Sequence, residues 1–261
     1  MLHLMLSESE EYLMRNTWIV MPAYNAGENL KNTYNELPHE FKSKVILVDD
    51  CSSDDTTSIS ESLGIITIRH NVNVGYGGNQ KTCYTEALKR GADVVVMVHP
   101  DHQYDARVVG IMSELISLGN CDIVLGNRIR TRREALSGGM PHWRYFLNRS
   151  STFVENLLLG QTIGDFHSGL RAYSRETLEK IPFELNSNDF AFDQQLLIQA
   201  VALKLRIADI PIPARYEDTS SSISFKRSLK DGVMGAIAIS QFFLHRLRLF
   251  PSKKFLSKQQ Y

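Results

Sequence analysis

The sequence lacks an excess of charge of either sign. Lysine and arginine together number 29, and aspartate and glutamate also number 29, so the formal net charge at pH 7 is zero. A chain without a net positive field has no long-range attraction for a polyanion. We therefore expect no nucleic acid among its partners.

Cysteine is also scarce. The chain has three cysteines, Cys51, Cys83 and Cys121, and their spacing matches no metal-binding motif. The odd number argues against a disulfide framework and indicates a reducing compartment. Residues 8–11 contain three glutamates where a secretion signal would need basic residues before an apolar core. We interpret the protein as cytoplasmic.

A long hydrophobic run is missing as well. A membrane-spanning helix needs about 20 consecutive apolar residues, and the longest apolar stretch near the C-terminus, Gly232 to Ile239, is much shorter. Aromatic, leucine and cationic side chains follow it: Phe242, Phe243, Arg246, Leu247, Arg248, Phe250, Lys253 and Lys254. This pattern predicts an amphipathic helix that makes a peripheral contact with the inner face of a membrane. The alternatives are packing against the preceding domain or a homo-oligomer contact.

Neither of the two standard phosphate-binding signatures is present. Gly75-Tyr76-Gly77 has Gln80 where the dinucleotide fingerprint requires its third glycine, and no Gly-Lys-Ser/Thr sequence occurs. A nucleotide would have to be bound in another way, by carboxylates against its base and ribose and by a metal and arginines at its phosphates.

What the chain does contain is an alternation of short apolar runs with helical patterns. The expected strands are 17–21, 44–48, 65–68, 94–98 and 122–125. Such an alternation predicts an α/β fold with a mostly parallel, Rossmann-like sheet flanked by helices. We predict one domain over residues 1–225 and an amphipathic, basic helical tail over residues 226–261.

The most apolar of these strands, Val94 to Val98, ends in a polar cluster that holds Asp101 and Gln103. Side chains two residues apart on an extended chain point the same way, so these two can share a small cation. Mg²⁺ takes one or two protein oxygens and leaves its other positions to water and substrate phosphates. The pattern predicts a metal site, and the alternative is a polar turn that only ends the strand.

Three further polar clusters follow other strands. Pro22 to Asn25 come after the first strand, Asp49 and Asp50 after the second, and Gly126 to Arg128 after the fifth. Ligands of an open parallel sheet bind beyond the carboxyl ends of the strands. We expect these clusters to meet Asp101 in one crevice.

The second half of the chain follows the alternation less closely. Residues 131–140 are predicted to be a mobile loop, 143–159 and 189–203 helices, and 206–212 an edge strand because prolines alternate at its end. Trp143, Tyr145 and Phe146 are expected in the core. Arg171 is expected to support the acceptor loop through a salt bridge rather than to touch substrate, and His102, His142 and His167 are interpreted as polar surface or loop residues.

Six short motifs follow one another between about Thr17 and Ser224. They are Met21-Pro22-Ala23-Tyr24-Asn25, Val48-Asp49-Asp50-Cys51-Ser52, Asn73-Val74-Gly75 with Gly78-Asn79, Pro100-Asp101-His102-Gln103, Gly126-Asn127-Arg128, and Asp165-Phe166-His167-Ser168-Gly169-Leu170-Arg171. Through this set the chain resembles the family 2 glycosyltransferases of the GT-A fold, and within them the dolichol-phosphate mannosyltransferase-like branch. The resemblance implies a nucleoside diphosphate sugar as donor, a divalent metal and an inverting transfer.

The resemblance also implies roles for individual residues. Donor binding falls to Pro22, Ala23, Tyr24, Asn25, Asp49, Asp50, Gly75, Gly78, Asn79, Pro100 and Asp101. Metal binding, of Mg²⁺ or Mn²⁺, falls to Asp101, Gln103 and His99. His99 stands where the family has the first aspartate of its Asp-x-Asp motif, and an imidazole is a poorer ligand for hard Mg²⁺ than a carboxylate. The alternatives are a preference for Mn²⁺ and a His99 that hydrogen-bonds a phosphate or a metal-bound water instead of the metal.

Catalysis is expected to depend on two arginines and, for some acceptors, on a carboxylate. Arg128 and Arg144 match positions that contact the donor diphosphate. A polyprenyl phosphate acceptor arrives ionised and needs no base, whereas a hydroxyl acceptor needs one, for which Asp193 is the first candidate and Asp165 the second. Gln195 stands where this branch commonly has a glutamate, so the resemblance does not decide the acceptor. It can be a lipid-linked or glycan acceptor or a soluble hydroxyl.

Two further classes of function are compatible with the same residues. A nucleotidyltransferase would use a similar sheet, but such enzymes usually carry a basic, glycine-rich loop after the first strand, and Pro22 to Asn25 contain no lysine or arginine. A non-catalytic homologue is the other alternative, because His99 replaces a metal ligand.

Overall fold

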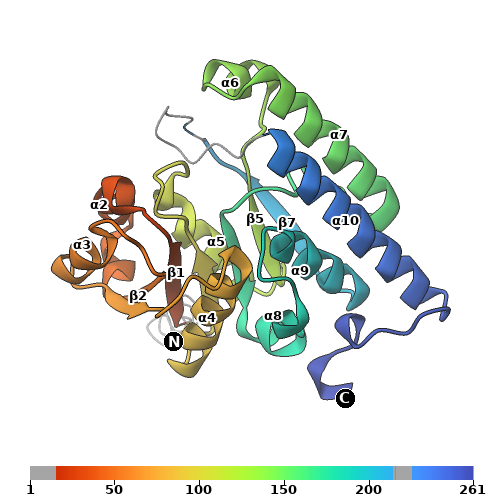
Figure 1. Cartoon of the computed structure of the whole chain (residues 1–261), viewed down its shortest axis with the longest axis horizontal. Coiled ribbons are helices and arrows are strands. Elements are labelled where there is room, and N and C mark those ends of the chain that lie inside the picture. The colour runs from red at the N-terminus through yellow and green to blue at the C-terminus, as the bar shows by residue number, and fades with distance from the viewer. Residues whose placement is uncertain (1–15, 214, 216–224, 261) are drawn as a thin grey trace, which may run out of the picture.

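A computed structural model describes residues 16–213, 215 and 225–260, which form a twisted sheet covered by helices on both faces (Figure 1). Within these residues the sheet has seven strands in the order β3-β2-β1-β4-β6-β5-β7. Their bounds are β1 Thr17–Ala23, β2 Val45–Asp49, β3 Ile66–Arg69, β4 Val94–Met97, β5 Ile123–Asn127, β6 Arg171–Ser174 and β7 Ile207–Pro211. The α/β prediction is confirmed, and β7 lies at the sheet edge as the prolines indicated.

The helices of the described residues connect these strands. The α-helices are α2 Gly27–Glu36, α3 Thr56–Ser62, α4 Tyr76–Lys89, α5 Val109–Ser117, α6 Arg132–Ser137, α7 His142–Leu159, α8 Arg175–Lys180, α9 Ala191–Ala202 and α10 Phe225–Arg246. Short 3-10 helices are η1 His39–Lys44, η2 Ala106–Val108, η3 Phe183–Leu185, η4 Lys253–Phe255 and η5 Lys258–Gln260.

The five inner strands are buried on both faces, and alternate residues enter two separate cores. In β4, Val95 and Met97 pack with α4, α8, α9 and α10, whereas Val94 and Val96 pack with α2 and α5. All four side chains are fully buried. This explains why the run is apolar without a period of two, as expected for a central strand of a helix-covered sheet.

Strand β6 differs in direction from its neighbours. It runs antiparallel to both β4 and β5, while the other strand pairs are parallel. The carboxyl ends of β1, β2, β4 and β5 therefore still meet at one edge, and the segment before Arg171 arrives at that same edge. This brings residues 165–171 beside the polar clusters that end the parallel strands.

The prediction of a loop over residues 131–140 is wrong, because Arg132–Ser137 form helix α6. The Thr131 hydroxyl caps this helix by accepting a hydrogen bond from the Glu134 backbone N–H at 3.1 Å. Thr131 and Glu134 have the spacing of a capping box, which is a helix-start signal in the sequence. The expectation for Trp143 and Phe146 is also wrong, since their side chains are 40% and 57% exposed.

Helix α10 packs along α9 and contributes to the same core as the sheet. Ala238, Ile239 and Phe242 are buried there, and Phe255 of η4 closes the cluster from the other side. Leu247 and Phe250, which follow the helix, are exposed. Part of the apolar stripe thus packs against the domain, the alternative that the sequence left open. No described helix combines the length and apolar character needed to cross a bilayer.

Candidate functional site

A cavity of about 1030 Å³ lies beyond the carboxyl ends of the parallel strands. The sequence-predicted residues that line it are Pro22, Ala23, Tyr24, Asn25, Asp50, Gly75, Asn79, His99, Pro100, Asp101, Gln103, Arg128, Arg144 and Asp193. The strand-end clusters therefore meet at one cavity, as expected. Asp49, Gly78 and Asp165 were also predicted as site residues, but they do not contact the cavity.

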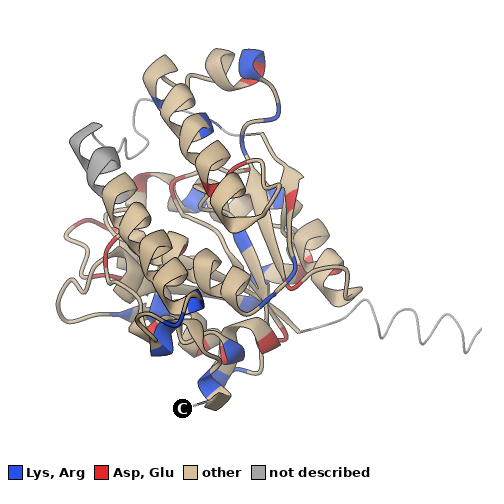
Figure 2. Ribbon diagram, turned by 90° about the vertical axis from the view of Figure 1, so that its right-hand side faces the viewer, with Lys and Arg blue, Asp and Glu red and all other residues tan. Residues whose placement is uncertain are grey.

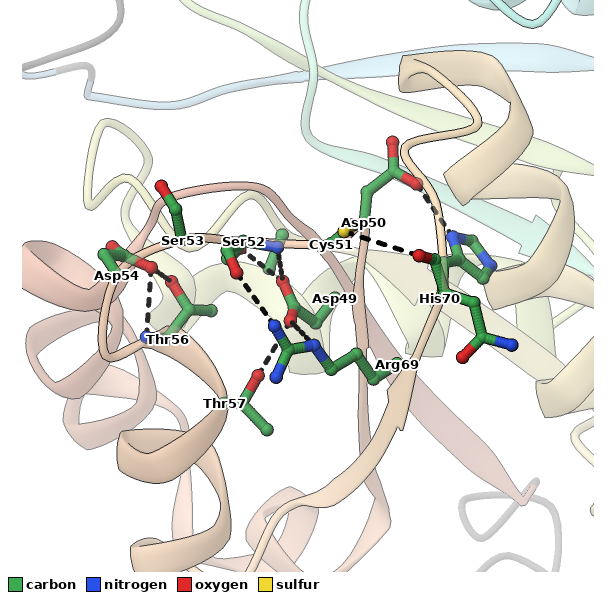
Figure 3. A network of polar contacts seen from close by, with 12 residues as sticks. Asp49, Asp50, Cys51, Ser52, Ser53, Asp54, Thr56, Thr57, Arg69 and His70 are labelled. Carbon is green, nitrogen blue, oxygen red and sulfur yellow. Dashed lines mark hydrogen bonds and ion pairs between the residues drawn. The ribbon is translucent and has the colours of Figure 1, made fainter.

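Asp49 holds the turn that follows β2 (Figure 3). Its fully buried carboxylate accepts hydrogen bonds from the Ser52 hydroxyl and from the Thr57 hydroxyl at 2.7 Å, and it forms an ion pair with Arg69 at 3.4 Å. These contacts fix the loop that presents the next residue, Asp50, to the cavity.

Asp50 connects the end of β2 to the loop before α4. Its carboxylate accepts from the backbone N–H groups of Val74 at 2.9 Å and Gly75 at 3.0 Å, and Oδ1 also lies 2.8 Å from His70 Nδ1 (Figure 3). Gly75 has φ +88°, a left-handed conformation that glycine adopts without strain. The two residues together shape one wall of the cavity.

The first turn of α4 is packed unusually tightly. Asn79 donates to the carbonyl oxygens of Ala23 at 3.1 Å and Val48 at 3.0 Å, and so joins the ends of β1 and β2. A Cβ at Gly78 would lie 2.9 Å from Val74. These contacts place α4 against the strand ends and leave no room for larger residues.

The residues predicted to bind metal lie together after β4. Asp101 Oδ1 accepts from the Gln103 backbone N–H at 3.1 Å, and Asp101 Oδ2 has no hydrogen bond among the described residues. No group of three or more His, Cys, Asp and Glu side chains suited to a metal occurs in the part of the chain that the structure describes. A single free carboxylate oxygen fits Mg²⁺ or Mn²⁺ completed by phosphate and water, and does not fit an all-protein cage.

His99 belongs to a hydrogen-bonded network with Tyr76 and Asp193. The Tyr76 hydroxyl donates to Asp193 Oδ2 at 2.7 Å and lies 3.1 Å from His99 Nε2. Since its one proton goes to the carboxylate, the hydroxyl accepts from His99 Nε2–H, which leaves the Nδ1 lone pair of the neutral ring available. Burial lowers the pKa of His99, against the opposing effect of the Asp101 and Asp193 carboxylates, so the ring is neutral.

Asp193 lies at the start of α9 and is held from three sides. Besides Tyr76, Gln80 donates to its Oδ1 at 3.1 Å, and Arg171 lies 3.8 Å from Oδ1. Arg171 is 1% exposed and donates to the carbonyl oxygens of Phe166, Ser168 and Asp193. It supports its loop, as the sequence indicated, and it also lines the cavity.

Arg128 and Asp165 form a buried, two-bond ion pair. Arg128 Nε donates to Asp165 Oδ2 at 2.7 Å and Nη2 to Oδ1 at 3.2 Å, while Nη2 also donates to the His167 carbonyl oxygen at 2.9 Å. Burial alone would raise the pKa of Asp165, but Arg128 lowers it to about 2. The carboxylate stays ionised and fixes the guanidinium at the cavity wall.

Three cavity residues were missed or assigned a lesser role from the sequence. Tyr76 stands in the sequence between the glycines of an incomplete phosphate signature, although an aromatic hydroxyl at a helix start is a candidate binding group. Asn148 lies on the inner side of α7 and donates to Asp165 at 3.2 Å. His167 was interpreted as a loop residue, yet it lines the cavity and pairs with the buried Glu155 at 3.2 Å. No sequence signal brings Glu155 and His167 together.

Known proteins are similar to this chain in sequence. The family described as Glycosyl transferase family 2 matches residues 18–182. A relative from Methanococcus voltae, named UDP-N-acetylglucosamine--dolichyl-phosphate N-acetylglucosaminyltransferase, is 29% identical over 220 residues, which cover 78% of this chain and 87% of the relative. The undecaprenyl-phosphate mannosyltransferase of Micrococcus luteus is 26% identical over 231 residues, or 85% of this chain and 90% of that one.

Solved structures with the same fold include glucosyl-3-phosphoglycerate synthase from Mycobacterium tuberculosis. Its complex with Mn²⁺, UDP-glucose and phosphoglyceric acid aligns with a TM-score of 0.66 at 17% identity, covering 90% of this chain and 84% of that one. The complex with UDP alone aligns with the same TM-score, covering 87% of this chain and 80% of that one. At this identity the likeness bears on the fold.

Proposed function

Because the chain belongs to glycosyl transferase family 2 and has the GT-A fold, we propose that it transfers a sugar from a nucleoside diphosphate sugar to a polyprenyl phosphate, with inversion and with a divalent metal. The observation that carries this proposal is the cavity that Asp101, Arg128 and Arg144 line together. A carboxylate and two guanidinium groups around one space suit a metal-bound diphosphate.

The donor nucleoside would lie against Pro22 to Asn25 and Asp50. Asp50 Oδ1 accepts from two donors, whereas Oδ2 accepts, among the described residues, from Gly75 N–H alone, so one acceptor position is left for an N–H of the base. Tyr24 is 57% exposed at the end of β1 and offers a flat surface to a ring. Asp49, Gly78 and Asn79 would act indirectly, by fixing this wall.

The metal would be held by Asp101, with Gln103 and His99 beside it. His99 would use Nδ1, because Nε2 is engaged with Tyr76. When bound, Mg²⁺ or Mn²⁺ supplies positive charge to the diphosphate leaving group. Nitrogen ligation at His99 favours Mn²⁺ over Mg²⁺ relative to a site with a second carboxylate.

Charge builds up on the departing phosphate, and Arg128 and Arg144 would stabilise it. Preorganised charges of this kind usually supply the largest part of a rate enhancement. Asp165 keeps Arg128 in place, and its pKa of about 2 makes it a poor proton acceptor. We therefore assign Asp165 to positioning rather than to the role of base.

Asp193 bears on the acceptor. Both carboxylate oxygens already accept hydrogen bonds, from Gln80 and Tyr76, and Arg171 stands beside them. A carboxylate with these contacts is better suited to fix the neighbouring side chains of the site than to remove a proton. This favours an acceptor that arrives ionised, and the two relatives named above carry dolichyl-phosphate or undecaprenyl-phosphate in their names.

The test is transfer by the purified full chain from a panel of UDP- and GDP-sugars to a short polyprenyl phosphate, followed by mass spectrometry with Mg²⁺, Mn²⁺ or chelator. We expect metal-dependent product, and Asp101→Asn should lower kcat/KM by about 100-fold or more. Asp55→Asn, which changes an exposed carboxylate outside the cavity, is the matched control and should keep the activity.

Two results would contradict the proposal. Full turnover in Asp101→Asn or in the presence of chelator would remove the metal assignment. Transfer to an alcohol but not to the polyprenyl phosphate would remove the acceptor assignment, and loss of that transfer in Asp193→Asn would then identify Asp193 as the base.

A further inference from the structure

Helix α7 has its polar and apolar sides reversed. A surface helix normally turns its apolar side to the core and its polar side to water. On α7 the buried residues include Thr152 and Glu155, whereas Phe153 and Leu157 are 69% and 72% exposed.

The exposed apolar residues of α7 form one stripe. At about 100° per residue, Trp143, Phe146, Leu147, Phe153, Leu157 and Leu158 fall within one arc of about 140°. Isolated exposed apolar side chains need no explanation, but a stripe along a whole helix marks a contact surface.

Helix α10 extends this surface. It runs beside α7 in both views (Figures 1 and 2), and it exposes Val233 and Ile237. Leu249 and Phe250, directly after the helix, are 62% and 70% exposed. We call the exposed apolar residues of α7, α10 and residues 247–250 the α7–α10 face.

The exposed charges carried by residues 142–160 and 232–260 have one sign. Residues 232–260 contain no aspartate or glutamate, and the one acidic residue of residues 142–160, Glu155, is 3% exposed. The exposed charges on these segments are cations, among them Arg149, Arg246 and Arg248. Aromatic and leucine side chains bordered by cations, without acids, are complementary to an anionic lipid surface.

The α7–α10 face is continuous with the cavity. Leu147 of α7 and Val233 of α10 are both partly exposed and both line the cavity. A molecule on this face therefore lies next to the cavity, which Arg144 on the first turn of α7 also lines.

We propose that the α7–α10 face is a membrane-docking surface, which inserts its aromatic and leucine side chains into the headgroup boundary of an anionic bilayer and turns the cavity opening toward the lipid. This inference deepens the proposed function, on which it rests for its purpose: a phosphate at the headgroup level would enter without its lipid chain leaving the bilayer. The sequence predicts a membrane contact through the C-terminal helix alone. In the proposed surface, α7 contributes a large part of the apolar residues.

A second copy of the chain fits this face less well. A two-fold interface would pack the face against itself. Arg149, Arg246 and Arg248 would then be drawn toward an interface to which residues 142–160 and 232–260 of the second copy bring no exposed acid. Burying unpaired charge is costly, whereas anionic headgroups supply the counter-charge.

The test is sedimentation of the full chain with vesicles of phosphatidylcholine alone or of an equal mixture of phosphatidylcholine and phosphatidylglycerol. The variant Phe153→Gln with Leu157→Gln changes two exposed residues outside the cavity lining. We expect wild type to bind the mixed vesicles in preference to the neutral ones, and the variant to bind them about tenfold or more weakly.

A matched control is Ile111→Gln with Leu118→Gln, which changes two exposed apolar residues, 55% and 54% exposed, on and just after α5. This control should bind vesicles like wild type. Both double variants should release nucleoside diphosphate from donor in detergent at the wild-type rate, because none of the four residues lines the cavity.

The outcomes separate this inference from the proposed function. Transfer to a polyprenyl phosphate in detergent without vesicle binding by the wild-type chain would overturn the docking surface alone. Vesicle binding that depends on Phe153 and Leu157, with no transfer to a polyprenyl phosphate, would overturn only the assignment of the acceptor. A lipid-free dimer that the Phe153→Gln, Leu157→Gln variant converts to monomer would assign the face to a second copy and overturn the proposal.

Discussion

The buried carboxylate of Asp165 is ionised because Arg128 lies against it. Both of its oxygens accept hydrogen bonds from that guanidinium, and Asn148 and the His167 backbone N–H donate to Oδ1 as well. A buried pair of this kind adds little net stability, but removal of one partner leaves a charge without compensation. The pair therefore positions the Arg128 guanidinium, and loss of Asp165 would displace a residue that lines the cavity.

This pair predicts a dependence of stability on pH. The pKa of Asp165 is lowered from 3.8 to about 2, so its contribution is present above pH 4 and is lost as the pH falls through about 2. The difference corresponds to about 2 kcal/mol of unfolding free energy. Between pH 4 and pH 2, urea unfolding of wild type should lose about this much more than unfolding of Asp165→Asn.

The control for this measurement is Asp55→Asn, which removes an exposed carboxylate and leaves Arg128 paired. Its loss of stability between pH 4 and pH 2 should equal that of wild type. An Asp165→Asn variant with the same pH profile as wild type would show that the ion pair does not lower the pKa.

At the scale of single residues, the sequence revealed groups that stand at strand ends and missed groups that meet only through the tertiary structure. Asp101 and Arg128 could be predicted because the end of a buried strand is a position that a pattern reveals. The contact of Tyr76 with Asp193, or of His167 with Glu155, joins segments far apart along the chain. No local pattern encodes such a pairing.

At the scale of elements, helix starts decide the shape of the site. Helix α4 begins at a loop held by Asp50, and its second residue, Gly77, donates its backbone N–H to the Asn188 carbonyl oxygen at 2.8 Å. A Cβ at Gly77 would clash with the Ser187 carbonyl oxygen and lie 2.7 Å from Phe192 Cβ. The start of α4 can approach the segment before α9 only because this position has no side chain.

Gly77→Ala should therefore lower the unfolding free energy by about 1–3 kcal/mol, the usual cost of overpacking. Urea denaturation at neutral pH measures it. The matched control is Gly110→Ala on α5, where the nearest atom to an added Cβ lies 3.6 Å away. That change should be neutral or stabilising by up to about 1 kcal/mol, because alanine favours helix. Equal stability of both variants would contradict the close contact.

The sequence predicted where strands occur better than it predicted the direction in which each strand runs. The expected strands agree with β1 to β5 within one or two residues at most ends, because apolar runs bounded by turn residues are a strong signal. Strand β6, with the sequence Arg-Ala-Tyr-Ser, carries no sign of its antiparallel place between β4 and β5. Its position is set by the two cores that its neighbours form, which lie outside the reach of local pattern.

At the scale of the whole molecule, α10 is both a part of the core and a part of the α7–α10 face. Phe242 is 6% exposed and packs against Phe255, while Phe250 is 70% exposed. One segment thus carries two phenylalanines with opposite surroundings. The helical tail predicted over residues 226–261 is integrated with the domain through the first of them.

Phe242→Ala should cost about 3–5 kcal/mol of unfolding free energy, because it empties a buried site between α9 and α10. Phe250→Ala, the matched control, should change stability by less than about 0.5 kcal/mol. Thermal or urea unfolding distinguishes the two. If Phe242→Ala unfolds at the wild-type midpoint, α10 does not belong to the cooperative core.

The position of β6 also has a consequence for how the chain folds. Val94 of β4 pairs with Ser174, and Ile123 of β5 pairs with Tyr173, so β5 leaves the ribosome before either of its neighbours, β6 and β7, has been made. Until then both of its hydrogen-bonding edges are without a partner strand, and α7 is synthesised in the same interval with its apolar stripe outward. Non-local pairing of this kind is slow, and the nascent protein is most prone to aggregate in the time before Ser174 emerges.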